Sequence, residues 1–574
     1  MLKDQDLTGA AWMLLTPDQG IVIDAAGLRH AGSAAPVSAE DRFQVGSITK
    51  TMIATGVLRL ATQQRVALDT PVQDILPEIR WVNPWNATHP VRLRHLLDHT
   101  AGLEDASLRH VFSGKARPDS PLSEVFGRGP VQVSVRTRPG SEYSYSNIGY
   151  VLVAMVIERV VGQRYETYLD ANLLQPLGMT SSTFAYTPQT PGVSPSLVTG
   201  HVDGAVPQPS APTHLRAAGQ FLTTARDMGA FAQFLLGNGL VDGATFIDAR
   251  LLREMGHVSG TVAAKAGLNA GYALGMWRRD RHGVVGLCHE GSTVGFRALL
   301  CLYPHERKAF FIGFNMDSES ADYGVFDALM IEQLAIPKSS IEPAIATPKD
   351  DVSAWVGWYR RVPGKVPAFE YLDLVFNPVS IASRGSVLVL HPLFSDEVEL
   401  TPLGRQRFRA TGRATASHVL LAGERGPEWS NGFSTYRKVD RWVLIALWLN
   451  LALGLVGALY VLAVGGWRLL RHARAFRSDP LAPTWLVVLG IPLTGLLLGQ
   501  SWQRMGDLTM ASGLLAFLTA ALPIAAGWGL WRVAKRVGND HVHRGRRDAW
   551  MLIAIFQWCV VLAAWGMLPL RTWA

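Results

Sequence analysis

The first apolar residues of the chain form two short runs separated by a turn. Ala10–Thr16 and Gly20–Ala25 are each of strand length, and a Pro-Asp-Gln turn lies between them, which is typical of a β-hairpin. Over Ser47–Gln63 the pattern changes, because apolar residues recur every three or four positions, as on one face of a helix. We therefore predict a strand pair and then a helix that begins at Ser47.

Strand patterns return late in the first part of the chain. The runs are Val284–Cys288, Phe296–Tyr303 and Ala309–Asn315, and a helical pattern follows over Asp322–Leu334. The long stretch before them is mostly helical in pattern. Strands at both ends of a sequence, with helices inserted between them, form one sheet faced by helices. We expect residues 1–335 to be an α+β domain, an antiparallel sheet flanked by helices with a helical insertion.

A smaller unit is expected after a linker. Residues 336–353 are rich in Pro, Ser and Ala, as linkers are. Residues 354–436 contain short apolar runs separated by Gly and Pro, among them Tyr371–Phe376, Ser386–Leu390 and His418–Ala422. This spacing predicts a small all-β module of five to eight strands. No catalytic constellation stands out within it.

The last part of the chain, residues 437–574, contains four apolar segments. They extend over about 442–467, 485–502, 509–531 and 549–570, and tryptophan stands at most of their ends. Each is near the ~20 residues that cross a bilayer, the second being the shortest, and tryptophan favours the membrane interface. We expect a four-helix transmembrane tail, because four buried core helices would not follow one another with such short polar loops.

Charge is distributed unevenly between the tail and the rest. The chain carries a formal charge of +8, but the residues from Arg437 onward hold 15 Lys and Arg against 5 Asp and Glu. The basic excess therefore lies in the apolar tail, and we expect no nucleic-acid partner. The loops after the first and third apolar segments hold ten basic residues, and the other side holds five. Basic loops stay in the cytoplasm.

Residues 1–436 are therefore predicted to lie on the periplasmic or extracellular side of a cytoplasmic (inner) membrane. The start of the chain is not typical of a signal peptide, because Asp4 and Asp6 precede only a short apolar run. We expect the export signal to lie upstream of the first residue, with export driven by the first membrane segment as the alternative.

Cysteines and cofactor motifs add little to this picture. Cys559 lies in an apolar segment and is expected to be a small buried residue. Cys288 and Cys301 fall on strands that could be neighbours, but their spacing alone favours two thiols over a disulfide. No metal-ligand spacing, phosphate-binding loop or dinucleotide fingerprint occurs, so we expect no cofactor.

The sharpest chemical feature is Ser47 with Lys50 three positions later. On a helix, residues at this spacing lie on one face, one turn apart. A serine hydroxyl needs a base to become a nucleophile, and a lysine amine serves as one when burial or nearby positive charge lowers its pKa. Lys50 is the only lysine of the chain with serine at this spacing. Ser47 is therefore the candidate nucleophile.

Two further motifs could complete such a site. Tyr145 and Asn147 lie in a turn-rich loop before a predicted helix, Val151–Val161. A phenol beside a lysine can relay a proton, and an asparagine can donate a hydrogen bond to a substrate carbonyl or to the lysine. Taken alone, this motif is more often a capped helix start with a packed tyrosine.

The third motif, residues 289–292, follows the strand Val284–Cys288 and contains His289, Gly291 and Ser292. Gly291 would leave room for an extended substrate backbone, and the N–H of Ser292 could bind an oxyanion. A lone histidine in this place would more often be structural.

The order of the three motifs resembles the serine β-lactamase and penicillin-binding protein superfamily. The resemblance covers about residues 1–335, and four further stretches, 95–103, 174–179, 218–227 and 271–277, are similar to its class C-like branch. That branch includes D-alanyl-D-alanine carboxypeptidases, D-aminopeptidases and esterases. The resemblance implies a serine hydrolase that forms an acyl-enzyme with a small-molecule or peptide substrate.

The resemblance also implies a role for each residue. Ser47 would be acylated, Lys50 would be its general base, and Tyr145 would protonate the leaving group. Asn147 would contact the substrate amide. The N–H group of Ser47 and that of Ser292, from the third motif, would form the oxyanion hole. His289 stands where the family has the lysine of a Lys-Thr-Gly motif.

The departure at His289 shifts the expected substrate. That lysine helps to bind a substrate carboxylate, whereas His289 is mostly neutral at about pH 7, and Glu290 would repel a carboxylate if it faced the cleft. We therefore expect an ester, amide or D-amino-acid peptide as substrate, with β-lactamase or carboxypeptidase activity as the alternative. A non-catalytic membrane receptor that retained the fold is a further alternative. Transport is not favoured, because no Asp, Glu or Lys lies at the centre of the tail segments.

Overall fold

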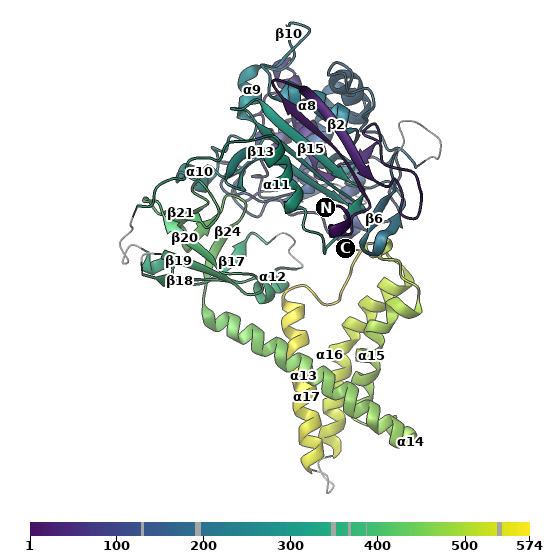
Figure 1. The fold of residues 1–574 in the computed structure, drawn as a ribbon. Coiled ribbons are helices and arrows are strands. Elements are labelled where there is room, and N and C mark those ends of the chain that lie inside the picture. The colour runs from purple at the N-terminus through teal and green to yellow at the C-terminus, as the bar shows by residue number, and fades with distance from the viewer. Residues whose placement is uncertain are drawn as a thin grey trace.

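Three units follow one another along the chain (Figure 1): an α+β domain, a β-barrel and a tail of apolar helices. The computed structural model describes residues 1–127, 131–189, 197–345, 352–364, 369–385, 387–536 and 542–573. In Figure 1 the α+β domain lies at the top, the barrel lies below it on one side, and the tail extends away from both.

The α+β domain is built on a seven-stranded antiparallel sheet in the order β11-β12-β13-β14-β15-β1-β2. Its strands are β1 (Gly9–Thr16), β2 (Gly20–Gly27), β11 (Gly271–Ala273), β12 (Met276–Arg281), β13 (Val284–Thr293), β14 (Phe296–Tyr303) and β15 (Lys308–Phe314). Ala10 of β1 lies opposite Phe314 of β15, so the first and the last strand of this sheet along the chain are hydrogen-bonded neighbours. The predicted strand pair and the three late strands are confirmed.

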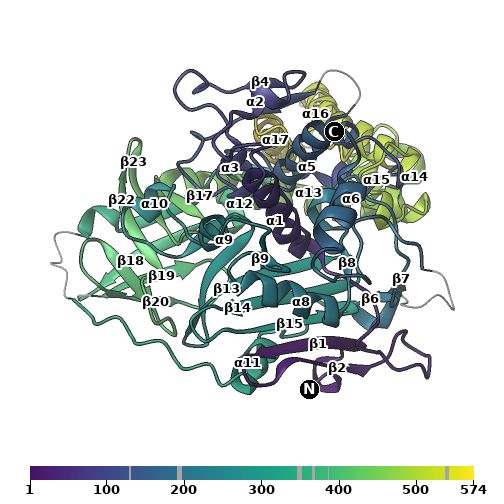
Figure 2. The same cartoon turned by 90° about the horizontal axis from the view of Figure 1, so that it is seen from above.

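Helices cover both faces of this sheet, as Figure 2 shows. On one face lie α1 (Thr49–Thr62), α5 (Asn147–Val161) and α8 (Ala225–Leu235), whose apolar side chains form the larger core. On the other face α11 (Gly324–Gln333) packs over a smaller core. Short helices of the insertion include α3 (Leu93–Leu97), α4 (Leu108–Val111), α6 (Tyr165–Leu169), α7 (Arg216–Gly219), α9 (Ala249–Glu254) and α10 (Val262–Lys265).

The second unit is a closed barrel of eight antiparallel strands, which confirms the predicted all-β module. The strands are β17 (Gly357–Val362), β18 (Val379–Arg384), β19 (Val387–Pro392), β20 (Val398–Pro402), β21 (Arg407–Ala410), β22 (His418–Gly423), β23 (Gly426–Ser430) and β24 (Thr435–Val439). Inward residues such as Tyr359, Leu400 and Trp429 fill its interior. Ser386, the first residue of one predicted strand, lies outside the described residues.

One predicted strand of this module is wrong. Tyr371–Phe376 belongs to a helix, α12 (Glu370–Phe376), between β17 and β18. Tyr371, Leu374 and Val375 are spaced as on one face of a helix, and they pack with Leu444 of the first tail helix. The run is short enough to fit either pattern, and contact with the tail selects the helix.

The linker contacts the barrel, whereas the cysteine pair differs from expectation. Ile336 is buried in the smaller core of the α+β domain. Residues 337–345 lie on the surface, where the backbone N–H groups of Glu342 and Ile345 bond to the barrel, and residues 346–351 lie outside the described part. Cys288 and Cys301 form a disulfide, so the expected pair of thiols is wrong. The register of β13 and β14 places the two residues directly opposite each other, a fact that spacing in the sequence does not reveal.

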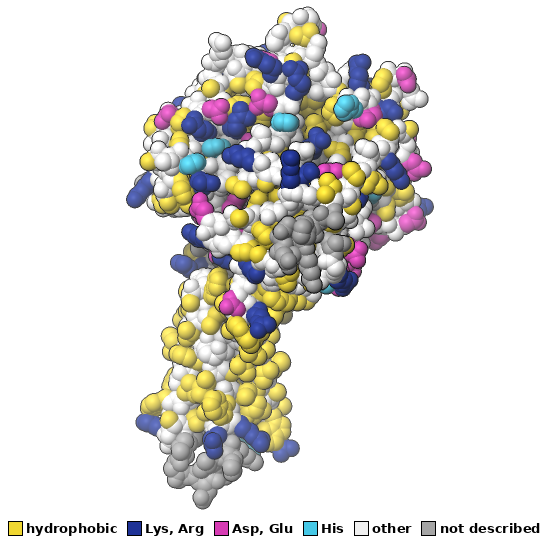
Figure 3. Space-filling model, turned by 90° about the vertical axis from the view of Figure 1, so that its left-hand side faces the viewer, with side chains coloured by type: hydrophobic (Ala, Val, Ile, Leu, Met, Phe, Trp, Pro, Cys, Tyr) yellow, Lys and Arg dark blue, Asp and Glu magenta, His cyan; other side chains and the backbone are white. Residues whose placement is uncertain are grey.

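The tail contains α13 (Arg441–Arg471), α14 (Ala473–Phe476), α15 (Ala482–Leu497), α16 (Met510–Arg536) and α17 (Val542–Ala564). Three of these helices, α13, α16 and α17, contain segments that are long and apolar enough to cross a membrane. Figure 3 shows hydrophobic side chains over the outer surface of the tail and Lys and Arg at the end remote from the α+β domain. Cys559 is buried among the helices, as expected.

The second of the four predicted membrane segments is shorter than expected. Helix α15 ends at Leu497, so the described part of the chain has three long apolar helices and one of 16 residues. The predicted segment ran on to Trp502, whose ring instead packs against Phe112 of the α+β domain. Asp507 accepts hydrogen bonds from the Ser113 hydroxyl at 2.7 Å and the Gly114 N–H at 3.0 Å. The connection between α15 and α16 is thus docked on the α+β domain.

Candidate active site

Ser47 lies in a short 3-10 turn at the start of the predicted helix. The turn, Gly46–Ile48, follows β3 (Phe43–Gln44) and leads into α1. Gly46 has a φ of +49°, and a Cβ there would lie 2.6 Å from the backbone nitrogen of Ser292. Only glycine permits both this φ and this approach at low cost. The turn is therefore pressed against β13, and that contact sets the position of Ser47.

Lys50 lies one turn further along, and its amine reaches back to Ser47. Its Nζ lies 3.0 Å from Ser47 Oγ and donates to the Ala218 carbonyl at 2.8 Å. The side chain is fully buried. Burial lowers the pKa of Lys50 from 10.5 to about 7, against an opposing effect of Asp105. An amine with this pKa is partly neutral at neutral pH, so it can accept a proton from Ser47.

Tyr145 reaches the same serine from a distant loop. Its hydroxyl lies 2.8 Å from Ser47 Oγ, and its ring lies 4.9 Å from Lys50 Nζ. The ring packs against His99 with 4.3 Å between centroids, and His99 Nδ1 accepts the N–H of Ser146. Burial raises the pKa of Tyr145 well above 10. The phenol therefore keeps its proton, which leaves Lys50 as the group able to act as base.

Asn147 is the first residue of α5, so the helix begins four residues before the predicted start. Its backbone N–H and its side-chain amide both donate to Asp105 Oδ1, at 2.8 and 2.9 Å. Among the described residues, no hydrogen bond joins Asn147 to Lys50. Asp105 thus holds Asn147 beside the site and places a negative charge near the lysine. A contact between Asn147 and a substrate stays a prediction.

Gly291 and Ser292 lie within β13 and not after it. A Cβ at Gly291 would come within 1.9 Å of the Val45 carbonyl oxygen and 3.0 Å of the Ser47 nitrogen. The glycine therefore makes room for the turn that carries Ser47, whereas the sequence indicated room for substrate. This close approach puts the backbones of Ser47 and Ser292 side by side, an arrangement in which two N–H groups can share one oxyanion.

His289 is buried behind aromatic side chains. Its ring stacks on Trp277 with 5.0 Å between centroids, and its Nε2 lies 3.2 Å from the Tyr272 hydroxyl. Its Nδ1 lies 2.7 Å from the Glu290 carbonyl oxygen. Burial, and then the nearby Lys50, lower the pKa of His289 to about 3, so the ring is neutral. Of the residues of this motif, Glu290, Gly291 and Ser292 line the cavity at Ser47, and His289 lies behind its wall.

Glu290 faces away from the nucleophile. Successive residues of a strand point to opposite faces, and the Glu290 carboxylate lies near Arg279 at 3.4 Å and Arg281 at 3.6 Å. Its negative charge is thus compensated on the α11 side of the sheet. The repulsion of a substrate carboxylate that the sequence suggested does not follow from this geometry.

A cavity of about 810 Å³ opens at Ser47 and extends to the barrel. Tyr143 and Trp277 of the α+β domain line it, and so do Arg361 and Phe433 of the barrel. The Phe433 ring meets those of Tyr143 and Trp277, with 6.2 Å between centroids in each case. The barrel is therefore part of the site, although no feature of its sequence indicated this.

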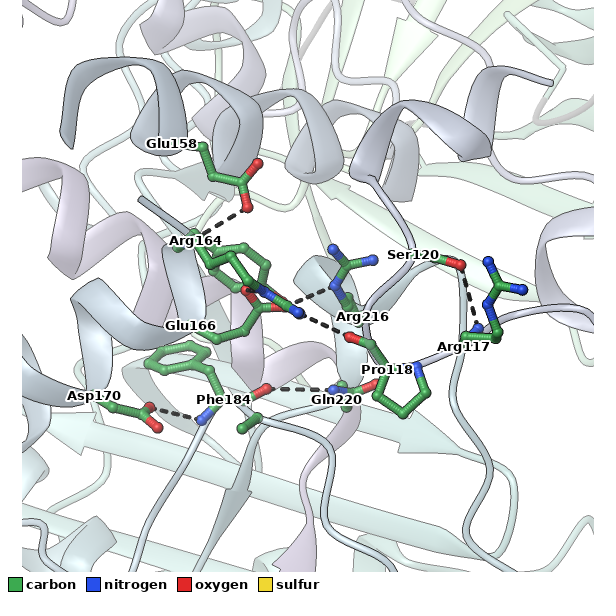
Figure 4. A network of polar contacts seen from close by, with 12 residues as sticks. Arg117, Pro118, Ser120, Glu158, Arg164, Glu166, Asp170, Phe184, Arg216 and Gln220 are labelled. Atoms are coloured by element: carbon green, nitrogen blue, oxygen red, sulfur yellow. Dashed lines mark hydrogen bonds and ion pairs between the residues drawn. The ribbon is translucent and has the colours of Figure 1, made fainter. Parts of the chain in front are cut away.

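A buried ion-pair network holds α7, the short helix that presents the Ala218 carbonyl to Lys50 (Figure 4). Arg216 of α7 pairs with Glu166 at 2.7 Å, and each side chain is only 4% exposed. Glu166 also pairs with Arg164 at 3.0 Å. Removing one partner of a buried ion pair leaves an uncompensated charge, which is costly. These side chains therefore hold α7 in place and, with it, the acceptor of the lysine.

We expect Glu166→Gln to destabilise the protein, because Arg216 would keep its charge in a buried place without a carboxylate. The apparent melting temperature should fall by about 5 °C or more, equivalent to about 3 kcal/mol. Thermal unfolding of the purified chain, followed by tryptophan fluorescence, measures this. The matched control is Glu78→Gln, whose ion pair with Arg159 is exposed and worth about 1 kcal/mol or less. Equal shifts in both variants would contradict the assigned role.

Several residues of the site were not singled out from the sequence. Four of them lie within stretches that resemble the class C-like branch: His99, Ala218, Tyr272 and Trp277. The resemblance therefore pointed to these stretches but assigned no role to the four residues. Asp105 had no such signal, and neither had Arg361 and Phe433, which reach the site only through the packing of the barrel. Within the described ranges, no group of three or more His, Cys, Asp or Glu side chains could hold a metal ion.

The α+β domain is similar to several known proteins. Residues 1–333 match the protein family described as Beta-lactamase. Penicillin-binding protein 4 of Amycolatopsis lactamdurans is 28% identical over 292 residues, which cover 49% of this chain and 74% of that protein. Esterase EstB of Burkholderia gladioli is 31% identical over 192 residues, which cover 32% of this chain and 48% of the esterase.

Solved structures extend the similarity beyond the α+β domain. The crystal structure of SurE is similar with a TM-score of 0.51 at 21% identity, and the match covers 76% of this chain and 96% of SurE. At this identity the likeness concerns the fold alone.

Proposed function

The chain belongs to the Beta-lactamase family, and from this premise we propose that it is a serine hydrolase that forms an acyl-enzyme on Ser47. The observation that carries the proposal is the contact of three groups. The Ser47 hydroxyl lies within hydrogen-bond distance of both the Lys50 amine and the Tyr145 phenol. A nucleophile with an adjacent base and a further proton donor is the arrangement that acyl transfer requires.

In the first half-reaction, the neutral Lys50 amine takes the proton of Ser47 while Oγ attacks the substrate carbonyl. One N–H of the amine stays bonded to the Ala218 carbonyl, which leaves the nitrogen lone pair for the serine proton. The negative charge that develops on the carbonyl oxygen is stabilised by the N–H groups of Ser47 and Ser292. The proton then passes to the leaving group through Tyr145, whose phenol is protonated.

In the second half-reaction, water attacks the acyl-enzyme and restores the Ser47 hydroxyl. Tyr145 and Lys50 remove the proton of that water by the same route in reverse. The substrates proposed are esters, amides and D-amino-acid peptides. An ester is consistent with the similarity to an esterase, and the buried, neutral His289 supplies no cation of the kind that recognises a carboxylate in β-lactamases and carboxypeptidases.

The apolar helices of the tail anchor this enzyme in a membrane. Helices α13, α16 and α17 have the length and hydropathy required, and many of their outward side chains, such as Leu459, Phe517 and Ile524, are apolar and exposed. Ten basic residues lie at the end of α13, in the segment between α13 and α15, at the end of α16 and at the start of α17, and such basic regions stay in the cytoplasm. The connection between α15 and α16, at the other end of these helices, contacts the α+β domain, which supports a periplasmic or extracellular position for that domain.

A fluorophosphonate probe tests the nucleophile. We expect the full chain, purified in detergent, to be labelled in a 1:1 ratio, and Ser47→Ala to remain unlabelled because the attacking oxygen is gone. The control is Ser395→Ala, a substitution of an exposed serine of the barrel, which should label as the unaltered protein does. Absence of labelling of the folded, unaltered protein would favour a receptor without catalytic activity.

The same probe tests the orientation. In intact spheroplasts, a membrane-impermeant fluorophosphonate should label Ser47 as fully as it does after lysis. Labelling that requires lysis would place the α+β domain in the cytoplasm.

A further inference from the structure

The cavity at Ser47 contains an arginine whose charge is not compensated. By contrast, each arginine that the α+β domain contributes to this cavity is paired with a carboxylate. Arg279 lies 2.6 Å from Asp327, Arg281 lies 3.6 Å from Glu290, and Arg297 lies 2.6 Å from Asp317. These pairs leave neither a free cation nor a free anion on that side of the cavity among the described residues.

Two basic side chains of the barrel are accounted for as well. The guanidinium of Arg413 donates to the Asp280 backbone carbonyl. The Asp280 carboxylate, which accepts from the N–H groups of Ala414 and Thr415, tends to raise the pKa of Arg413 and so stabilises its charge. Burial lowers the pKa of His418 to about 4, so this ring is neutral. Neither residue offers a free positive charge to a ligand.

Arg361 is different from all of these. It lies on β17, lines the cavity, and its guanidinium donates to the hydroxyl of Ser434. In the part of the chain that the structure describes, it forms no ion pair. The positive charge of Arg361 tends to lower the pKa of Tyr143, although burial has the larger, opposite effect. Tyr143 lines the same cavity. A half-buried guanidinium beside an acylation site, bonded only to a neutral hydroxyl, is a site for an anion.

The hairpin between β23 and β24 makes this a preformed site. Phe433 N–H donates to the Asn431 side chain at 3.0 Å, and Gly432 N–H donates to the Ser430 hydroxyl at 3.1 Å. Gly432 has a φ of +83°, and a Cβ there would lie 2.2 Å from the Ala270 carbonyl oxygen, so the hairpin is pressed against the α+β domain. Its Ser434 fixes Arg361, and its Phe433 supplies an apolar wall beside the cation.

We propose that Arg361 of the barrel binds a carboxylate of the substrate, so that the preferred substrates are esters or amides that carry a negative charge outside the scissile bond. This inference rests on the proposed acyl-enzyme function and names its substrate class. It also gives the barrel a role in specificity. The cation comes from the second unit of the chain, because His289 of the first unit is neutral and lies behind the cavity wall.

Matched substrate pairs test this assignment in the full-length protein. One pair carries the charge on the acyl side, 4-nitrophenyl hydrogen glutarate and its neutral methyl ester. The other pair carries it on the leaving group, the butyrate ester of 4-hydroxybenzoate and that of its methyl ester. The readout is the ratio of kcat/KM for the anionic over the neutral member. For at least one pair, we expect Arg361→Gln to lower this ratio about tenfold or more, the effect of losing a charge-assisted hydrogen bond.

Two variants and a salt titration make the test specific. Arg361→Lys keeps the charge and should retain part of the preference. Arg360→Gln alters the adjacent arginine, which lies near Glu370 at 3.8 Å, and should leave the ratio as in the unaltered protein. In the unaltered protein, added NaCl should lower the ratio, because salt screens the attraction. A ratio that folded Arg361→Gln leaves unchanged for both pairs would overturn the proposal, whatever the effect of salt.

A failure of the Arg361 proposal can be distinguished from a failure of the acyl-enzyme proposal. If Arg361→Gln fails to fold, the salt titration of the unaltered protein decides alone. If the unaltered protein takes up fluorophosphonate on Ser47 but has no preference for the anionic member of either pair, Arg361 is not the anion site and the acyl-enzyme proposal stands. If there is neither labelling nor hydrolysis, the acyl-enzyme proposal itself is wrong.

Discussion

Replacing Lys50 with methionine is expected to slow the acylation of Ser47 by about 10³-fold or more, because it removes the base that takes the serine proton. Methionine matches the length and apolar character of the lysine stem, which is fully buried. The fold should therefore survive, whereas an alanine would also leave a cavity. The rate of fluorophosphonate labelling and kcat/KM for a 4-nitrophenyl ester measure the effect.

The pH dependence of the unaltered protein provides a second test of the same group. Burial lowers the pKa of Lys50 to about 7, and only the deprotonated amine can accept a proton. Activity should therefore rise with pH through about 7 and level off above it. In Lys50→Met the residual rate should lose this rise.

Lys115→Met, which alters an exposed lysine, is the control for loss of a lysine as such. It should keep both the rate and the pH profile. If Lys50→Met retained most of the activity, or if its profile still rose through about pH 7, another group would have to be the base.

Much of the α+β domain could be predicted because its signals are local. The hairpin of β1 and β2, strand β14 and helix α1 each follow from the spacing of apolar residues within one segment. The helix at Tyr371 could not be predicted in this way, since six residues fit either pattern and the contact with Leu444 that selects the helix lies elsewhere in the chain. The same reason applies to the disulfide, which depends on the register of two strands.

The residues of the candidate site likewise differ in whether local sequence spacing or long-range packing brings them together. Ser47 and Lys50 lie on one helical turn, so their contact follows from spacing alone. Tyr145 is brought to them by long-range packing, and only its place in a familiar order of motifs indicated it. The burial of His289 behind Trp277 depends on how β12 and β13 pair. The approach of Arg361 and Phe433 depends on how two units pack, for which a single sequence offers no pattern.

The second large effect is expected from Tyr145→Phe. The substitution removes the hydroxyl that lies 2.8 Å from Ser47 Oγ and keeps the ring that packs on His99. We expect kcat to fall by about 10²-fold or more for amides and alkyl esters, because their leaving groups depart only when protonated. KM should change little, since the shape of the cavity is retained. Steady-state kinetics on a matched amide and alkyl ester measure this.

The choice of leaving group separates the roles that Tyr145 could have. A 4-nitrophenolate departs without a proton, so if the phenol serves the leaving group, the loss should be much smaller for a 4-nitrophenyl ester than for an amide of the same acid. An equal loss for both would mean that the hydroxyl acts instead on Ser47 or on the deacylating water. Tyr168→Phe, which alters a buried tyrosine of α6, controls for the loss of a buried phenol. A rate close to that of the unaltered protein for the amide would remove Tyr145 from the mechanism, and Lys50 would then have to both accept the serine proton and return it to the leaving group.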